Sequence, residues 1–179
     1  MRSTRDEAFT AYVVARRGQL FRTAYLLCGD PHRAEDLVQT ALAKLYAAWP
    51  RMARADSVDA YARRTVVNSH LDEGRRPWRR ERPTDDAALD RAADQGLSVE
   101  DSDALWTALR ALAPGQRRVV VLRHYWGLSV EETATDLGIS TGTVKSQTSE
   151  ALRHLRSALA PAGRDDTTTD TRTTKGIQR

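Results

Sequence analysis

The segment SVEETATDLGISTGTVKSQTSEALRHLR spans residues 129–156 and sets the architecture of the second half of the chain. Ser129 and Glu132 have the spacing of a capping box, in which each side chain accepts a hydrogen bond from a free backbone amide at the start of a helix. Gly138 is a good left-handed end for that helix. A longer amphipathic helix follows after a turn of three or four residues. This order is typical of a helix-turn-helix.

The second helix of this motif has one apolar face and one polar face. Val144, Ala151 and Leu155 are expected to lock it in place, so that the small polar residues and the lysine at its start can enter a major groove. Side chains of this kind suit base edges and phosphates, although a plain helical hairpin would show the same pattern. The candidate DNA contacts are Thr141, Gly142, Thr143, Lys145, Ser146, Ser149 and Arg153. Further phosphate contacts are expected from the preceding helix, at Arg117, Arg118 and Arg123.

Two more helices are expected upstream of the motif. Apolar residues recur at helical spacing from Ser102 to Leu112, and a further helix is expected from Gln116 to Tyr125. Three aromatic side chains are expected to pack in the core or on a domain surface, namely Trp106, Tyr125 and Trp126. Together with the motif, these helices predict a small helical domain over residues 102–160.

The first half of the chain begins with two predicted helices. One apolar stripe runs from about residue 5 to Cys28, where the tripeptide 29–31 (Gly-Asp-Pro) breaks the helix. Asp30 can cap the next helix, and Pro31 suits its first position, where no amide donor is needed. This second helix is expected to end at Trp49-Pro50, because proline restricts the residue before it.

A third helix is expected from near Ser57 to Gly74, with Arg63, Arg64 and Asn68 on its polar side. The three helices predict a domain over residues 5–80. The predicted fold class is therefore all-α, with two small helical domains.

The charge changes sign between the two predicted domains. Five arginines lie between Arg75 and Arg82, whereas residues 83–103 contain seven acidic residues and one arginine. Residues 81–101 therefore predict a flexible acidic linker. The tail over residues 161–179 is expected to be disordered, because it has too few apolar residues to order itself. The formal net charge of +4 is compatible with a polyanionic partner.

Several classes of protein are excluded by what the sequence lacks. No run approaches the length of a membrane span, and the N-terminal residues do not have the pattern of a signal peptide. A cytoplasmic protein without membrane insertion is expected. Cys28 is the single cysteine, and the four histidines are scattered. With no nucleotide, hydrolase or metalloprotease motif, we expect neither an enzyme nor a cofactor or metal site.

Three stretches of the chain carry a family resemblance: LRALAPGQRRVVVLRHYWGLSVEETATDLGISTGTVKS (residues 109–146), LFRTAYLLCGDPHRAEDLVQTAL (residues 20–42) and AYARRTVVNSHLDEGRR (residues 60–76). They resemble, in that order, region 4, region 2 and the helix of region 2 that reads the −10 element in the extracytoplasmic-function (ECF) sigma factors. The resemblance covers roughly residues 7–80 and 100–158 and points to the actinobacterial SigE-type subgroup. It implies a factor that directs RNA polymerase to promoters.

The resemblance also assigns roles to residues of this chain. It implies that the helix over residues 31–49 docks on the β′ clamp helices of core polymerase through Glu35, Asp36 and Gln39. It implies that the −10 element is contacted by Arg64, Asn68, Asp72, Arg75 and Arg76, with Asn68 holding a flipped base. Region 4 is implied to read the −35 element and to pack on the β flap. A monomer that an anti-sigma factor can bind is the family expectation.

The recognition helix departs from the family pattern at two positions. Many members of the family carry arginine where this chain has Gln147 and Glu150, and a carboxylate beside DNA would weaken binding. A tilted recognition helix, or phosphate contacts from Arg153 and the preceding helix, would accommodate this. The alternative function is a dimeric helix-turn-helix regulator, which would bind palindromic operator DNA without polymerase. That alternative leaves the resemblance of the first half unexplained.

Overall fold

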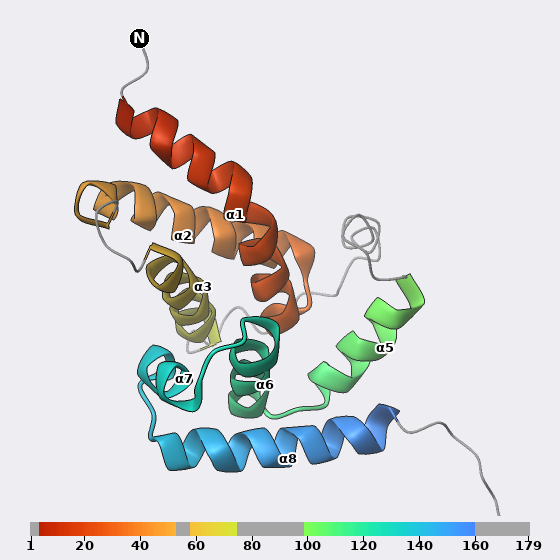
Figure 1. The fold of residues 1–179 in the computed structure, drawn as a ribbon. Helices are drawn as coiled ribbons and strands as arrows, with labels where there is room; N and C mark the ends of the chain where they lie inside the picture. The colour runs from red at the N-terminus through yellow and green to blue at the C-terminus, as the bar shows by residue number, and fades with distance from the viewer. Residues whose placement is uncertain (1–3, 53–57, 75–98, 160–179) are drawn as a thin grey trace, which may run out of the picture.

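The computed structural model describes residues 4–52, 58–74 and 99–159. Within these ranges every regular element is a helix, as the sequence predicts (Figure 1). None of the described helices is long and apolar enough to cross a membrane. The predicted linker up to residue 98, the contacts predicted at Arg75 and Arg76, and the tail over residues 161–179 lie outside the described residues.

The first half is a three-helix unit made of α1 (Thr4–Cys28), α2 (Pro31–Met52) and α3 (Val58–Gly74). Its core is aliphatic and fully buried around Leu20, Val38, Leu45 and Val66. The predicted cap of α2 is confirmed, because the Asp30 carboxylate accepts a hydrogen bond from the amide of Arg33 at 2.9 Å. The break between α1 and α2 thus arises from local chemistry that the sequence shows.

α2 does not end at Trp49-Pro50 but continues to Met52, with Pro50 inside the helix. A proline in a helix cannot donate to the carbonyl four residues earlier, which here belongs to Tyr46. The guanidinium of Arg5 donates to that carbonyl at 2.7 Å instead. The predicted end was therefore slightly early, because a side chain from α1 replaces the hydrogen bond that the proline removes.

The second half contains five helical segments: α5 (Val99–Arg110), α6 (Pro114–Val120), a π-helical turn (Val121–Tyr125), α7 (Val130–Leu137) and α8 (Thr141–Leu159). The helix predicted over residues 116–125 is thus divided into an α-helix and a π-helical turn. The amide of Trp126 bonds to the carbonyl of Val121 at 3.2 Å, five residues back. Sequence periodicity does not predict this turn.

The helix-turn-helix is built as the sequence predicts. The Ser129 hydroxyl accepts the amide of Glu132 at 3.0 Å, and the Glu132 carboxylate accepts the amide of Ser129 at 2.7 Å. Gly138 ends α7 with a φ of +65°. A cap that the sequence analysis missed begins α8, where the Ser140 hydroxyl accepts the amide of Thr143 at 3.1 Å.

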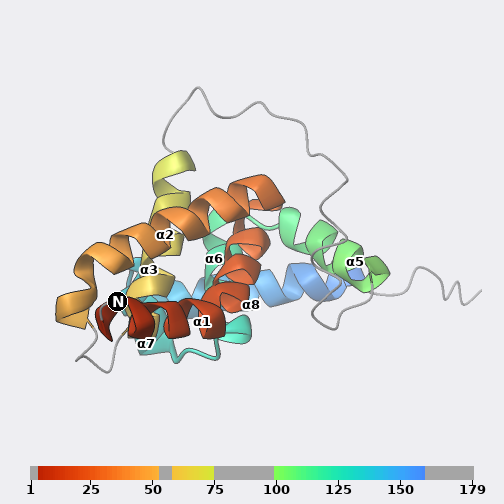
Figure 2. The same ribbon diagram turned by 90° about the horizontal axis from the view of Figure 1, so that it is seen from above.

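The two halves pack closely against each other. Leu27 of α1 and Val67 of α3 share one buried apolar cluster with residues of the second half, namely Val121, Leu122 and Leu128. Seen from above, α1 and α2 lie over α6, α7 and part of α8, whereas α5 lies to one side (Figure 2). The sequence predicted two units on a linker and gave no sign of this interface, because each apolar stripe was assigned to the core of its own half.

Candidate nucleic-acid interface

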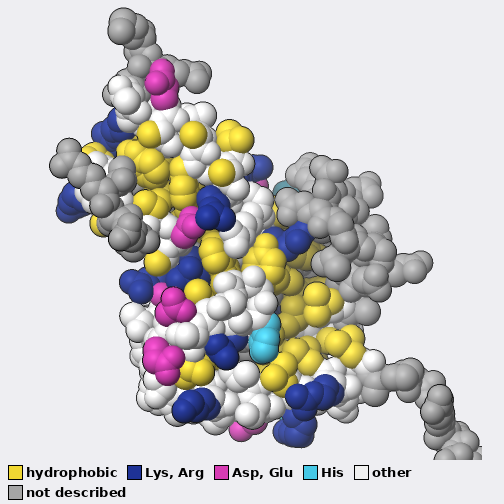
Figure 3. All heavy atoms as spheres, in the orientation of Figure 1, with side chains coloured by type: hydrophobic (Ala, Val, Ile, Leu, Met, Phe, Trp, Pro, Cys, Tyr) yellow, Lys and Arg dark blue, Asp and Glu magenta, His cyan; other side chains and the backbone are white. Residues whose placement is uncertain are grey.

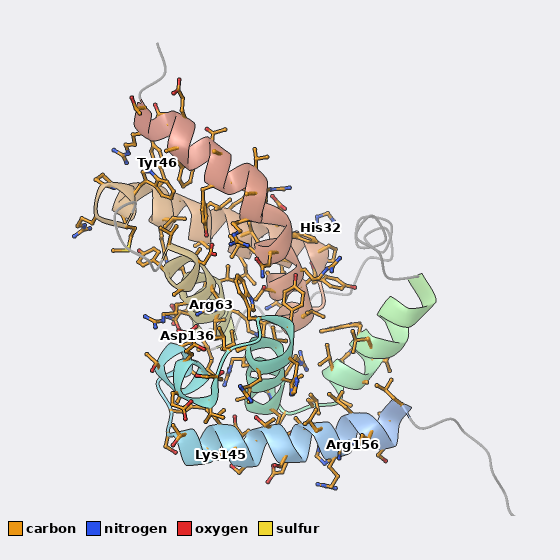
Figure 4. The ribbon with its side chains drawn as sticks, viewed as in Figure 1. His32, Tyr46, Arg63, Asp136, Lys145 and Arg156 are labelled. Atoms are coloured by element: carbon orange, nitrogen blue, oxygen red, sulfur yellow. The ribbon has the colours of Figure 1, made fainter. Side chains whose placement is uncertain are left out.

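The predicted reading face of α8 is exposed. Val144 and Ala151 are fully buried beneath the helix, as predicted, and fix which side faces outward. Lys145 and Arg156 project away from the rest of the molecule (Figure 4), and Lys and Arg side chains lie along this edge of the surface (Figure 3). The other predicted contacts, Thr141, Gly142, Ser146, Ser149 and Arg153, are also exposed, whereas Thr143 is half-buried.

Three of these predicted contacts take part in hydrogen bonds within the protein, and one of them is Arg153, whose guanidinium lies 3.1 Å from the ring nitrogen Nε2 of His154. The Thr143 hydroxyl lies 2.8 Å from the Ser140 hydroxyl, and the Ser146 hydroxyl donates to the carbonyl of Thr143 at 3.1 Å. Lys145 and Arg153 carry the positive charge of this face. They are the groups best suited to phosphate oxygens.

The two unusual residues of the recognition helix turn toward α6. The Glu150 carboxylate accepts a hydrogen bond from the Gln116 side chain at 2.9 Å. Gln147 lies so close to Gly115 that a Cβ atom there would be 3.0 Å from the Gln147 side-chain nitrogen. Glu150 is thus exposed but already hydrogen-bonded to the protein.

Two arginines predicted to contact phosphates serve the protein backbone instead. The Arg117 guanidinium donates to the carbonyls of Leu109, Arg110 and Leu112 at 2.9–3.4 Å and to that of Leu27 at 3.0 Å. The carbonyls of Leu109 and Arg110 lie in the last turn of α5, and that of Leu112 lies just after it, where a cation is favoured by the helix dipole. Arg123 donates to the carbonyl of Leu128. These hydrogen bonds leave the two guanidinium groups with fewer donors for phosphate oxygens than the sequence led us to expect.

The predicted −10 contacts lie on one face of α3. Arg64, Asn68 and Asp72 are each exposed and follow one another at intervals of four residues. Such a spacing places the three side chains side by side along the helix. The structure therefore brings together the described members of the predicted set.

Arg64 is bound to the second half through an ion pair that the sequence did not suggest. The Asp136 carboxylate of α7 accepts hydrogen bonds from Arg63 at 2.6 Å and from Arg64 (Figure 4). Arg63, expected on a polar face, is buried, because α7 covers that face. One sequence signal was available: Asp136 lies in the last turn of its helix, where the dipole disfavours an anion unless a cation is near.

Trp126 also contacts the first half of the chain beside this ion pair, in line with the packing role predicted for it. Its indole nitrogen donates to the Thr23 hydroxyl of α1 at 2.8 Å. The Arg63 guanidinium lies 4.9 Å from the centre of its ring, within the range of a cation–π interaction. A π-helical turn lies just before Trp126, and such turns frequently lie at functional sites.

The predicted polymerase contacts lie on the exposed side of α2. Asp36 and Gln39 are exposed, whereas the Glu35 carboxylate accepts hydrogen bonds from Arg17 at 2.6 Å and from Gln39 at 3.2 Å. Glu35 is thus partly used in holding α1 to α2. Across the described residues, no group of three His, Cys, Asp or Glu side chains is arranged to hold a metal ion.

Comparison with known protein families agrees with these two helical units. The family model described as Sigma-70 region 2 matches residues 4–80, and that described as Sigma-70, region 4 matches residues 102–155. The chain is 43% identical over 154 residues to the RNA polymerase sigma-E factor of Streptomyces avermitilis, with 84% of each chain covered. It belongs to the ECF group of the sigma-70 family.

Other relatives support the assignment of this sigma factor. The chain is 42% identical over 154 residues to the RNA polymerase sigma-E factor of Streptomyces coelicolor, covering 84% of this chain and 85% of the relative. It is 33% identical over 144 residues to the ECF RNA polymerase sigma factor SigM of Mycobacterium tuberculosis, covering 79% and 71%. The predicted resemblance to ECF sigma factors is thus confirmed.

Two solved structures share the fold. The sigma factor RpoE in complex with the anti-sigma factor NepR from Bartonella quintana has a TM-score of 0.70 and 23% identity, covering 88% of this chain and 99% of that one. CnrH in complex with the cytosolic domain of CnrY has a TM-score of 0.63 and 24% identity, covering 88% and 91%.

Proposed function

We propose that this sigma factor divides promoter recognition between two helices: α3 reads the −10 element and α8 reads the −35 element, while α2 docks on the β′ clamp helices of core RNA polymerase. The observation that carries the proposal is the exposed face of α3, where Asn68 lies between Arg64 and Asp72. Asparagine is unfavourable in a helix interior unless its side chain has a partner or a role. An exposed amide offers both donors and an acceptor to the edge of an unpaired base.

The role proposed for α8 rests on its exposure and charge. Its N-terminal turn presents small polar residues that allow the backbone to approach base edges. Lys145 and Arg153 supply phosphate contacts along the helix, and the buried Val144 fixes its orientation. The hydrogen bond from Gln116 to Glu150 limits the repulsion that the carboxylate would otherwise exert on DNA.

The role proposed for α2 rests on Asp36 and Gln39, which are exposed opposite its buried stripe. The β flap is the expected site for the second half. We also propose that an anti-sigma protein binds this factor, since the structural neighbour RpoE is a sigma factor in complex with an anti-sigma factor. The factor acts as a cytoplasmic monomer through recognition rather than catalysis, since sigma factors are not enzymes in the usual sense.

Run-off transcription with sigma-free core polymerase on the gene's own upstream region tests this proposal. Asn68→Ala should reduce the specific transcript by about 5-fold to 150-fold, which corresponds to the loss of one base contact worth about 1–3 kcal/mol. Thr107→Ala, at an exposed position of α5, is the control and should transcribe normally. Unaided binding to a palindrome, with no transcript, would instead favour the dimeric regulator.

A further inference from the structure

Asp136 joins the two halves at the proposed −10 surface. Its side chain is 1% exposed, and each carboxylate oxygen accepts a hydrogen bond from a different arginine of α3. A carboxylate bound by guanidinium groups resembles a bound phosphate in charge and in hydrogen-bond geometry. The protein thus places an acidic group of its own on Arg64, which we have assigned to DNA.

The position of Asp136 is favourable only while the halves are in contact. Within α7 the carboxylate lies in the last turn, at the negative end of the helix dipole. Arg63 is buried, so it has no access to water while the interface is closed. Loss of one partner of a buried ion pair leaves an uncompensated charge, which strongly disfavours the state that buries it.

The closed arrangement cannot span a promoter. By their numbering, the −35 and −10 elements lie about 25 base pairs apart, which is roughly 85 Å of DNA at 10–10.5 base pairs and about 34–36 Å per helical turn. In this structure α3 packs on α7 and α7 packs on α8. Because packed helices lie about 8–10 Å apart, α3 and α8 are separated by roughly 20 Å. The halves must therefore come apart before both elements can be bound.

We infer that Asp136 is an internal latch: it holds Arg63 and Arg64 against α7 in the free protein and releases them to DNA when the halves separate. The inference rests on the proposed roles of α3 and α8. It gives the ion pair a function beyond stability, since the same contact closes the molecule and occupies a DNA-binding guanidinium, although the Arg64 side chain stays 45% exposed. Other contacts between the halves, such as that of Trp126 with Thr23, hold the closed form without using a predicted DNA contact.

The first test measures opening of the full-length protein by energy transfer between two dyes. The dyes are attached to cysteines introduced at Ala43 and Ser157, which are exposed on α2 and α8, in a Cys28→Ser background. Asp136→Asn should lower the transfer efficiency. Glu131→Gln is the matched control, because it removes one carboxylate from an exposed position of the same helix and should leave the efficiency unchanged.

The second test measures binding of a fluorescein-labelled single-stranded oligonucleotide from the non-template strand of the gene's own upstream region. Asp136→Asn should bind at least about 5-fold more tightly than the unaltered protein, within the usual range for coupled sites. Glu131→Gln should give little gain. Adding Arg64→Ala to the Asp136→Asn variant should abolish the gain, since the released group is then missing.

A third measurement needs no variant at Asp136. If closure and DNA binding compete, saturating unlabelled oligonucleotide must open the dye-labelled, otherwise unaltered protein and lower its energy transfer, because coupling is reciprocal. No change there, or an Asp136→Asn protein that opens without gaining affinity, would overturn the latch. Failure of the proposed function shows elsewhere, as normal run-off transcription by Asn68→Ala.

Discussion

The two helices proposed to read DNA differ in how the protein treats them. α8 turns its polar face outward, with Lys145 fully available on the surface (Figure 4). α3 carries an equally polar face, yet Arg64 is held by Asp136 of the other half. The difference teaches that an internal ion pair acts on only one of the two helices. The second half supplies both an open reading helix and the carboxylate that binds Arg64 of the other one, whereas Asn68 and Asp72 stay exposed.

The largest effect on the contact between the two halves, measured as the free energy of unfolding, is expected from Trp126→Ala. The change removes the hydrogen bond to Thr23, the contact with Arg63 and the packing of the indole against apolar residues of both halves. Loss of a well-packed tryptophan costs about 3–5 kcal/mol of unfolding free energy. Urea unfolding followed by circular dichroism measures this, with Val14→Ala at an 81% exposed position as the control. A cost below about 1 kcal/mol would show that the interface contributes little.

A somewhat smaller effect on the free energy of unfolding is expected when the pH is lowered, because His70 of α3 then binds a proton. Burial lowers the pKa of His70 to about 4, and the positive charges of Arg33, Arg118 and Arg117 act in the same direction. The unfolded chain, with a pKa of about 6.5, binds the proton first. The unfolding free energy should therefore fall as the pH drops from about 6.5 to about 4, by on the order of 3 kcal/mol, and level off below.

Urea unfolding at a series of pH values checks this prediction. His70→Gln should flatten the profile between pH 6.5 and 4, whereas His154→Gln, at an exposed position of α8, should leave it unchanged. Two of the three arginines belong to the second half, so acid should also open the dye-labelled protein. An unaltered acid profile in His70→Gln would assign the pH dependence to other groups.

The smallest effect is expected at α8, where the open face should respond only to local charge. Gln116→Ala releases the Glu150 carboxylate from its hydrogen bond and should weaken binding of the second half to −35 DNA by a few-fold. Glu150→Gln should strengthen binding slightly, because a negative charge near phosphates is removed. Gel-shift titration with core polymerase present measures both. Weaker binding by Glu150→Gln would show that the carboxylate itself helps to position the helix.

Much of the fold could be predicted from local chemistry. The caps at Asp30 and Ser129, the break at Gly29 and the left-handed Gly138 all act within a few residues, so the sequence predicts them. The extension of α2 past Pro50 could not be predicted in this way, since it depends on Arg5 in another helix. The π-helical turn before Trp126 likewise has no periodic signal.

The candidate site shows the same division. Exposure of Asn68, Asp72 and Lys145 follows from their place opposite apolar stripes, and the sequence predicted it. The partners of Arg63, Arg117 and Arg123 were missed, because a guanidinium finds its acceptors in three dimensions rather than along one helix.

The sequence by itself determined the all-α class, the two units, the helix-turn-helix and the family, because periodicity, capping and motif spacing are local properties. Only the tertiary structure decided which polar faces are free. Asp136 and Arg64 are separated by 72 residues, and their pairing depends on how two aliphatic surfaces pack around Leu27 and Leu122. Apolar burial is not directional, so a stripe of leucine and valine does not specify which half of the chain will cover it.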